Sequence, residues 1–248
     1  MKAKDFKGII PPIQTSFTAD GELNEQGIRN LIRFTLPHVH AYYPIGTYGV
    51  GPLMTLDDRK KALEIILDEV NGKVPVIAHV GCADTKSVIE LAKHAKAAGA
   101  SAVASISPYY SPNLPDDMLF QYHADIIDAV QDEDFALFYH NCGNTVPQLA
   151  PDIYQLGARG YHFGNCIDLK DVLPAAPSDV LVMGNVDPAG ELRNGTPDSV
   201  RACVTHVMEQ CGSYPNFVIS SGCDIPPMSP WENLDAFFQA VTEYYAGA

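Results

Sequence analysis

The stretch that decides the fold is residues 74–108, VPVIAHVGCADTKSVIELAKHAKAAGASAVASISP. An apolar run ends at Gly81, an amphipathic segment begins at Thr85, and Gly99 precedes a second apolar run. Short β-branched runs predict strands, and apolar positions three or four residues apart predict a helix. The stretch is therefore predicted to form one strand–helix–strand unit with parallel strands.

The same alternation occurs eight times in the 248 residues, which predicts a single-domain (β/α)8 TIM barrel of the α/β class. Strands are expected at residues 8–17, 41–46, 74–81, 101–108, 135–141, 160–165, 179–185 and 217–223. Helices are expected at residues 24–35, 56–70, 85–98, 116–130, 147–156, 169–175, 198–210 and 231–245. A doubly wound open sheet is the alternative, but no GxGxxG motif follows the first strand.

Capping residues support these helix boundaries. Thr55 and Thr196 precede acidic residues and are expected to cap the N-termini of their helices. Glycines follow several helices, where a left-handed backbone is expected: Gly72, Gly99, Gly157 and Gly212.

Composition narrows the function classes. Thirty acidic residues against 16 basic ones give a net charge of -14, which disfavours nucleic acid and anionic membranes as partners. No apolar run is long enough to span a bilayer, and the first residues do not resemble a signal peptide, so a cytoplasmic location is expected. The six cysteines are scattered and expected to be reduced. The sequence carries no signature of an oligomeric state.

Three metal-ligand residue types follow the predicted strands at their C-terminal ends, where (β/α)8 enzymes place their active sites. His140 and Cys142 end the fifth strand and face the same side, and Cys223 ends the eighth. One His and two Cys leave the fourth position of a tetrahedral Zn²⁺ open, as in catalytic zinc sites. The alternative is that both cysteines are small core residues and His140 is an ordinary hydrogen-bonded histidine.

The second half of the chain resembles the uroporphyrinogen decarboxylase superfamily. The motifs that carry this resemblance are HNCGNT at 140–145, GNVDP at 184–188, NGTP at 194–197 and SGCDIPP at 221–227. They are most similar to the corrinoid-linked, zinc-dependent methyltransferase branch. The resemblance implies that His140, Cys142 and Cys223 are zinc ligands.

The first half resembles the dihydrodipicolinate synthase and N-acetylneuraminate lyase family of Schiff-base aldolases. The matching stretches are GIIPP at 8–12, GTYGVGPLMTL at 46–56, VPVI at 74–77 and PYY at 108–110. The resemblance implies a proton-relay role for Thr47 and Tyr110. The alternatives are a turn hydroxyl for Thr47 and an aromatic wall for the tyrosines.

This relay is incomplete. The family needs a lysine at the end of strand six, and residues 160–165 contain none. Lys170 comes at a predicted helix start and is expected to be solvated. His140 stands where the family has a tyrosine, and Val50 stands where it has a glutamate. Schiff-base chemistry is therefore not expected.

The change of resemblance near residues 131–134 suggests two half-barrels, 1–132 and 133–248. We interpret the chain as an engineered hybrid scaffold without a dedicated natural activity, with a natural fusion as the alternative. If it is active, we expect zinc-dependent methyl transfer to a thiol or a lyase reaction of the uroporphyrinogen decarboxylase superfamily. In the methyl transfer, Asp187 or Asp224 is expected to orient a ligand or to handle a proton. For both aspartates the alternative is a turn or cap role. A small molecule or a metal ion is the expected ligand at the barrel mouth.

Overall fold

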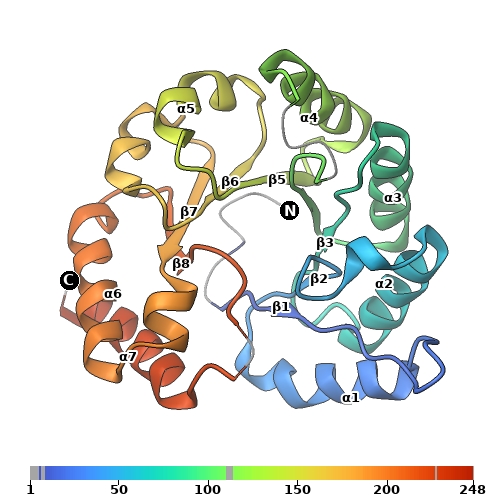
Figure 1. The fold of residues 1–248 in the computed structure, drawn as a ribbon, viewed down its shortest axis with the longest axis horizontal. Helices are drawn as coiled ribbons and strands as arrows, with labels where there is room; N and C mark the ends of the chain where they lie inside the picture. The colour runs from blue at the N-terminus through green and yellow to red at the C-terminus, as the bar shows by residue number, and fades with distance from the viewer. Residues whose placement is uncertain (1–5, 7–8, 110–113, 227, 248) are drawn as a thin grey trace. The chain divides into compact units, whose positions relative to one another are not determined.

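The computed structural model describes residues 6, 9–109, 114–226 and 228–247 (Figure 1). The chain divides into two compact units, and each is described by itself. Unit 1 comprises Met1–Tyr139 and Leu156–Arg159, and unit 2 comprises His140–Gln155 and Gly160–Ala248. The predicted join near residue 132 between halves of different ancestry stays a prediction.

In unit 1, short parallel strands alternate with helices. The strands are β1 (Pro12–Ile13), β2 (Tyr43–Pro44), β3 (Ile77–His79), β4 (Ala102–Ser105) and the first four residues of β5 (Ala136–Asn141). The helices are α1 (Glu25–Thr35), α2 (Leu56–Val70), α3 (Thr85–Ala98) and α4 (Asp116–Val130), with 3₁₀ turns η2 (Leu36–His38) and η3 (Gly51–Leu53). Strand β1 pairs with β2, and β4 lies between β3 and β5.

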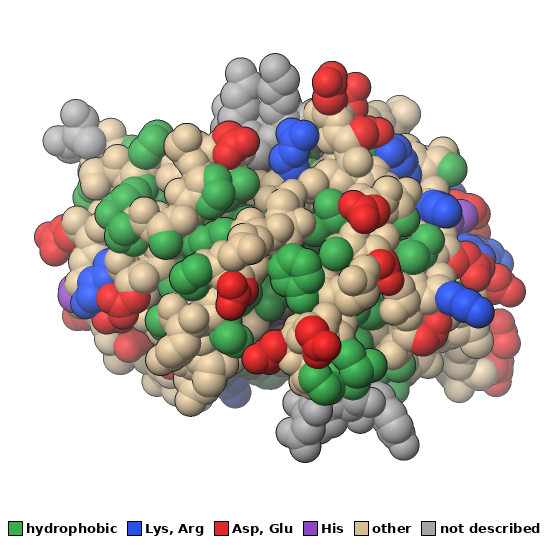
Figure 2. All heavy atoms as spheres, turned by 90° about the horizontal axis from the view of Figure 1, so that it is seen from above, with side chains coloured by type: hydrophobic (Ala, Val, Ile, Leu, Met, Phe, Trp, Pro, Cys, Tyr) green, Lys and Arg blue, Asp and Glu red, His purple; other side chains and the backbone are tan. Residues whose placement is uncertain are grey.

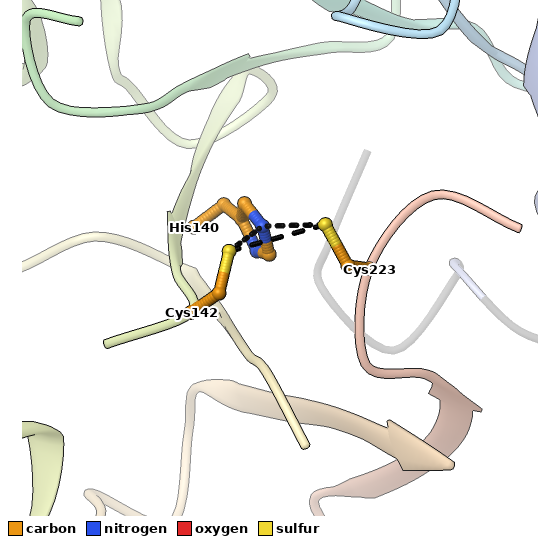
Figure 3. Close-up of side chains that lie close together, drawn as sticks. All are labelled: His140, Cys142 and Cys223. Carbon is orange, nitrogen blue, oxygen red and sulfur yellow. Dashed lines mark hydrogen bonds between the residues drawn. The ribbon is translucent and has the colours of Figure 1, made fainter. Parts of the chain in front are cut away.

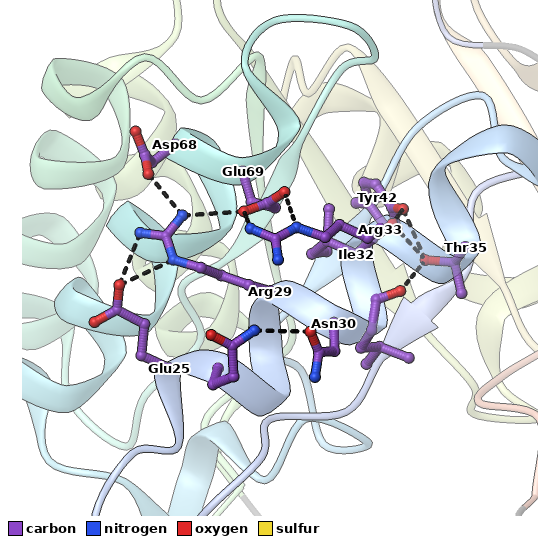
Figure 4. Close-up of polar contacts among 11 residues, drawn as sticks. Glu25, Arg29, Asn30, Ile32, Arg33, Thr35, Tyr42, Asp68 and Glu69 are labelled. Atoms are coloured by element: carbon purple, nitrogen blue, oxygen red, sulfur yellow. Dashed lines mark hydrogen bonds and ion pairs between the residues drawn. The ribbon is translucent and has the colours of Figure 1, made fainter.

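Ion pairs and apolar burial hold α1 against α2. Arg29 pairs with Glu25 on its own helix and with Asp68 of α2, at 2.8 and 2.7 Å, and Arg33 pairs with Glu69 at 2.7 Å (Figure 4). Glu25, Arg33 and Asp68 are exposed, and Arg29 and Glu69 are only partly buried, so each pair adds little to stability. The larger contribution comes from fully buried side chains of unit 1: Ile28, Ile32, Tyr42, Ile66, Ile77, Ile126 and Leu137.

Unit 2 contains the remaining parallel strands, in the order β6 (Gly160–Phe163), β7 (Leu181–Val186), β8 (Phe217–Ser221). Its helices are α5 (Val146–Gln155), α6 (Pro197–Cys211), α7 (Trp231–Gly247) and the π-helix η6 (Pro188–Arg193), with 3₁₀ turns η4 (Leu169–Asp171) and η5 (Leu173–Ala175). Its core includes Tyr161, Phe163, Leu169, Leu173 and Leu192. The strand–helix alternation is that of a (β/α)8 fold.

Several predicted boundaries are wrong. All eight strands are shorter than predicted or shifted, because apolar runs continue past the residues that pair. The helix expected at 169–175 is two 3₁₀ turns, since Pro174 lacks the backbone N–H that an α-helix needs in its interior. Thr55 and Thr196 cap their helices as predicted. Gly72, Gly99 and Gly157 have positive φ, but Gly212 is right-handed with φ of -64°.

The surface reflects the acidic composition. Figure 2 shows carboxylate side chains scattered over the face it presents, with fewer Lys and Arg side chains among them. Among the described residues, no helix is both long and apolar enough to cross a membrane. All six cysteines are free thiols.

Candidate metal centre

Three side chains of unit 2 converge beyond the C-terminal ends of its strands (Figure 3). His140 lies near the end of β5, Cys142 follows that strand, and Cys223 lies two residues after β8. Cys142 Sγ is 3.1 Å from His140 Nε2, and Cys223 Sγ is 3.9 Å from both Cys142 Sγ and His140 Nε2. The structure therefore brings together all three residues that the sequence singled out.

These distances fit a tetrahedral zinc site. With Zn–S of about 2.3 Å and Zn–N of about 2.0–2.1 Å, two sulfur ligands lie about 3.8 Å apart and a sulfur lies about 3.6 Å from a nitrogen. Only the 3.1 Å separation of Cys142 and His140 must widen, by about half an ångström. Cys142 is exposed, whereas His140 and Cys223 are partly buried. A zinc ion held by these three donors would have one coordination position open.

The imidazole of His140 is held in the orientation that a ligand needs. Its Nδ1 lies 3.1 Å from the backbone carbonyl oxygen of His162 on β6, and a carbonyl oxygen can only accept. Nδ1 therefore carries a proton, and Nε2 is the nitrogen that faces the two sulfurs. A backbone carbonyl on the far nitrogen is a common orienting partner of metal-binding histidines.

The two thiols affect each other's ionisation. The hydrogen bond from Cys142 and the proximity of His140 lower the pKa of Cys223, and the backbone N–H of Asp224 adds to this effect. The hydrogen bond to Cys223 and burial raise the pKa of Cys142. The hydrogen bond from the Cys142 thiol thus favours the thiolate form of Cys223, the form that binds a metal.

Two glycines allow the ligand-bearing loops to approach closely. A Cβ on Gly164 would lie 2.7 Å from both Cα and Cβ of Cys142, and a Cβ on Gly222 would lie 2.5 Å from the backbone nitrogen of Asn165. The Gly164 N–H also donates to the carbonyl oxygen of Asn141. The chain segments around Cys142 and Cys223 are thus packed in contact with the segment that follows β6.

The structure also describes Thr47, Asp187 and Lys170, which the sequence singled out. Thr47 is an exposed turn residue of unit 1, and Tyr110 falls outside the described residues. Asp187 caps η6, because its Oδ1 accepts from the N–H groups of Ala189 and Gly190 at 2.9 and 2.8 Å. Lys170 is exposed and pairs with Asp168 at 2.9 Å, as expected of a solvated lysine.

Two residues that contact the candidate ligands, His162 and Gly164, were not predicted from the sequence. His162 uses its backbone oxygen toward His140, and Gly164 acts by lacking a side chain. Neither role follows from residue type. The available signal was their spacing on the predicted sixth strand, which places both on the face that the ligands of strand five would also share.

Two sequence families match the chain. The model of the dihydrodipicolinate synthetase family matches residues 5–160, and the model of the uroporphyrinogen decarboxylase (URO-D) family matches residues 83–244. The two ranges overlap over residues 83–160, so they do not locate a join between two halves.

Curated relatives agree with the first family. The chain is 39% identical over 128 residues to the 4-hydroxy-tetrahydrodipicolinate synthase of Methanopyrus kandleri, covering 51% of this chain and 42% of that protein. It is 37% identical over 168 residues to the enzyme of the same name from Thermus thermophilus, covering 66% and 54%. It is 33% identical over 195 residues to that of Desulfotalea psychrophila, covering 73% and 63%. The aligned part spans about half the length of these relatives.

Solved structures confirm the fold. An N-acetylneuraminate lyase from Mycoplasma synoviae matches with a TM-score of 0.72 at 23% identity, covering 98% of this chain and 76% of that one. The 2-keto 3-deoxygluconate aldolase from Picrophilus torridus matches with a TM-score of 0.66 at 21% identity, covering 97% and 84%. The (β/α)8 fold predicted from the sequence is therefore correct.

The expectation of an engineered scaffold without a dedicated activity is wrong. Relatives at 33–39% identity are curated as 4-hydroxy-tetrahydrodipicolinate synthases, which indicates a natural chain with lyase relatives. None of these similarities supports an engineered chimera or methyl transfer to a thiol.

Proposed function

Because the chain belongs to the dihydrodipicolinate synthetase family and, over residues 83–244, to the uroporphyrinogen decarboxylase family, we propose that it is a zinc-dependent lyase. Its metal ligands are His140, Cys142 and Cys223. The observation that carries this proposal is their convergence at distances suited to a tetrahedral ion with one open position.

The chain lacks the lysine with which Schiff-base aldolases activate a ketone without a metal. A Schiff base needs a lysine at the end of β6, and Gly160–Phe163 contains none. The next lysine along the chain, Lys170, is exposed, and the carboxylate of Asp168 raises its pKa further. A nucleophilic amine must be unprotonated at neutral pH, so Lys170 is unsuited to the role.

The proposed substrates are small 2-oxo acids with a hydroxyl group on carbon 4, the class suggested by the names of the lyase and aldolase relatives. When bound, zinc supplies a Lewis acid that polarises a carbonyl oxygen and stabilises negative charge there. In the cleavage direction, the C3–C4 bond breaks and the 4-hydroxyl group loses its proton. Carbon 3 gains a proton, so a 2-oxo acid and an aldehyde form without a co-reactant.

The chain's own residues prepare this chemistry by fixing the donors. His140 presents Nε2 because the backbone of His162 occupies Nδ1, and Cys223 is the more readily ionised sulfur. Gly164 leaves the space that Cys142 needs. Preorganised ligands spend no free energy on rearrangement when the substrate binds.

The test is an assay of 4-hydroxy-2-oxo acid cleavage with the zinc-loaded protein, the chelator-treated protein and the protein reloaded with zinc. We expect activity that is lost on chelation and restored by zinc. Borohydride reduction in the presence of pyruvate should leave the protein mass unchanged. Activity that survives full metal removal, or a lysine adduct after reduction, would contradict the proposal.

A further inference from the structure

We propose that His162 is a positioning residue that ties together the two chain segments carrying the metal ligands, although it is not itself a ligand. The inference rests on the proposed function, because it concerns the same metal centre. It follows from three contacts within unit 2 that involve the backbone and the ring of this one residue.

The first two contacts hold His140. The carbonyl oxygen of His162 accepts from His140 Nδ1 at 3.1 Å. The two imidazole rings are also stacked, with centroids 4.6 Å apart and planes 25° apart. The hydrogen bond fixes which nitrogen of His140 faces the sulfurs, and the stacked ring restricts rotation of the imidazole about its side-chain bonds.

The third contact is with the chain segment that carries Cys223. The Nε2 of His162 lies 2.8 Å from the carbonyl oxygen of Ser221 and 3.1 Å from the hydroxyl oxygen of Ser220. A carbonyl oxygen only accepts, so Nε2 donates its proton to Ser221. These two residues end β8 and directly precede Gly222 and Cys223. His162 therefore links the His140 ring to the strand that presents Cys223.

The histidine side chain at position 162 combines two properties that these contacts need. A flat ring is needed for stacking on His140, and an N–H at the Nε2 position is needed for the carbonyl of Ser221. Phenylalanine retains a ring without the donor. Glutamine retains a donor of similar reach without the ring. These two substitutions separate the contributions, while the backbone bond to His140 is present in every variant.

The experiment compares the parent with His162→Phe, His162→Gln and the control His206→Gln, a histidine exposed on α6. Affinity for Zn²⁺ is measured by competition with a chromophoric chelator, and the ligand geometry is read from the absorption spectrum of the Co²⁺-loaded protein. Far-ultraviolet circular dichroism and thermal unfolding of the metal-free proteins show whether the fold is retained.

We expect His162→Phe to weaken zinc binding about 10-fold to 100-fold and to change the Co²⁺ spectrum, as loss of an outer partner does at other sites. His162→Gln should weaken zinc binding by a smaller factor. His206→Gln should match the parent in zinc affinity and in Co²⁺ spectrum. If His162→Phe does not fold, the His162→Gln variant tests the positioning role, because its Co²⁺ spectrum should still differ from that of the parent.

Different results would overturn the positioning role of His162 and the zinc centre of the proposed function. Folded His162 variants that bind zinc as tightly as the parent, with the parent's Co²⁺ spectrum, would overturn the positioning role and leave the zinc centre standing. A parent protein that binds neither ion would overturn the zinc centre and the positioning role together.

Discussion

Cys82 in unit 1 and Cys223 in unit 2 both follow the C-terminal end of a strand, but their surroundings differ. Cys82 is 5% exposed, and its Sγ lies 3.1 Å from Arg59 Nη1. Its backbone N–H and carbonyl both bond the hydroxyl of Tyr122. Burial raises the pKa of Cys82, an effect that the Arg59 guanidinium only partly offsets. This cysteine is part of the packing of unit 1.

Cys223 instead faces other metal-ligand atoms. Cys142 and His140 lower its pKa, so it ionises where Cys82 stays protonated. The Arg59 guanidinium that reaches Cys82 is itself occupied by the carbonyl oxygens of His79 and Gly81. A position at the end of a strand is therefore not enough to make a cysteine part of a candidate metal site. Convergence of donor atoms, oriented by a second layer of contacts, is also required.

The largest expected effect separates these two cysteines directly. Cys223→Ala should weaken zinc binding roughly 100-fold to 1000-fold, because each of three ligands carries about a third of a binding free energy on the order of 10 kcal/mol. Cys82→Ala should leave zinc affinity unchanged. Chelator competition measures both. Equal losses for the two variants would remove the distinction between the units.

The next prediction concerns stability in unit 1. Arg59→Met should lower the free energy of unfolding by about 3 kcal/mol, because the buried carbonyl oxygens of His79 and Gly81 lose a charged donor. Arg201→Met, which removes the ion pair between partly exposed Arg201 of α6 and exposed Glu243 of α7, should cost less than about 0.5 kcal/mol. Urea unfolding measures both. An Arg59 variant as stable as the parent would show that this guanidinium is not structural.

A smaller effect is expected at Gly164 in unit 2. Gly164→Ala places a Cβ against the backbone of Cys142, so we expect a loss of about 1–3 kcal/mol in stability and weaker zinc binding. Gly143→Ala is the matched control, because its Cβ would meet side-chain atoms alone, Asn141 Oδ1 at 3.0 Å and Thr145 Oγ1 at 3.9 Å. Unchanged zinc affinity in Gly164→Ala would show that the close approach does not position Cys142.

The smallest effect is a difference in thiol reactivity of the metal-free protein. A lowered pKa means more thiolate at a given pH, so iodoacetamide at pH 6 should modify Cys223 before Cys166. Cys166 is the more exposed of the two, so exposure alone predicts the reverse order. Cys142 should react only at higher pH, because its pKa is raised. Peptide mass mapping gives the order, and Cys166 reacting first would contradict the charge argument.

The sequence predicted the fold and the convergence of three candidate metal ligands, because both depend on regular patterns. Helices α2, α3 and α4 have the predicted boundaries, since apolar periodicity and caps such as Thr55 agree there. Convergence of His140, Cys142 and Cys223 follows from parallel strands ending at the same edge.

The rest depended on contacts that residue type does not encode. Apolar runs do not show where backbone pairing stops, so β1 and β2 were predicted too long. The strand–helix alternation predicted a helix at residues 169–175, but Pro174 in this segment is incompatible with the interior of an α-helix. The role of His162 depends on a backbone oxygen and on a ring that faces β8, which only coordinates reveal.

The central claim is that unit 2 holds zinc through His140, Cys142 and Cys223. The most direct test is the zinc content of the protein after expression with trace zinc and purification without added metal, measured beside the His140→Ala variant. We expect about one zinc per chain in the parent and almost none in the variant. A parent with far less than one zinc, or a variant with the same content, would contradict it.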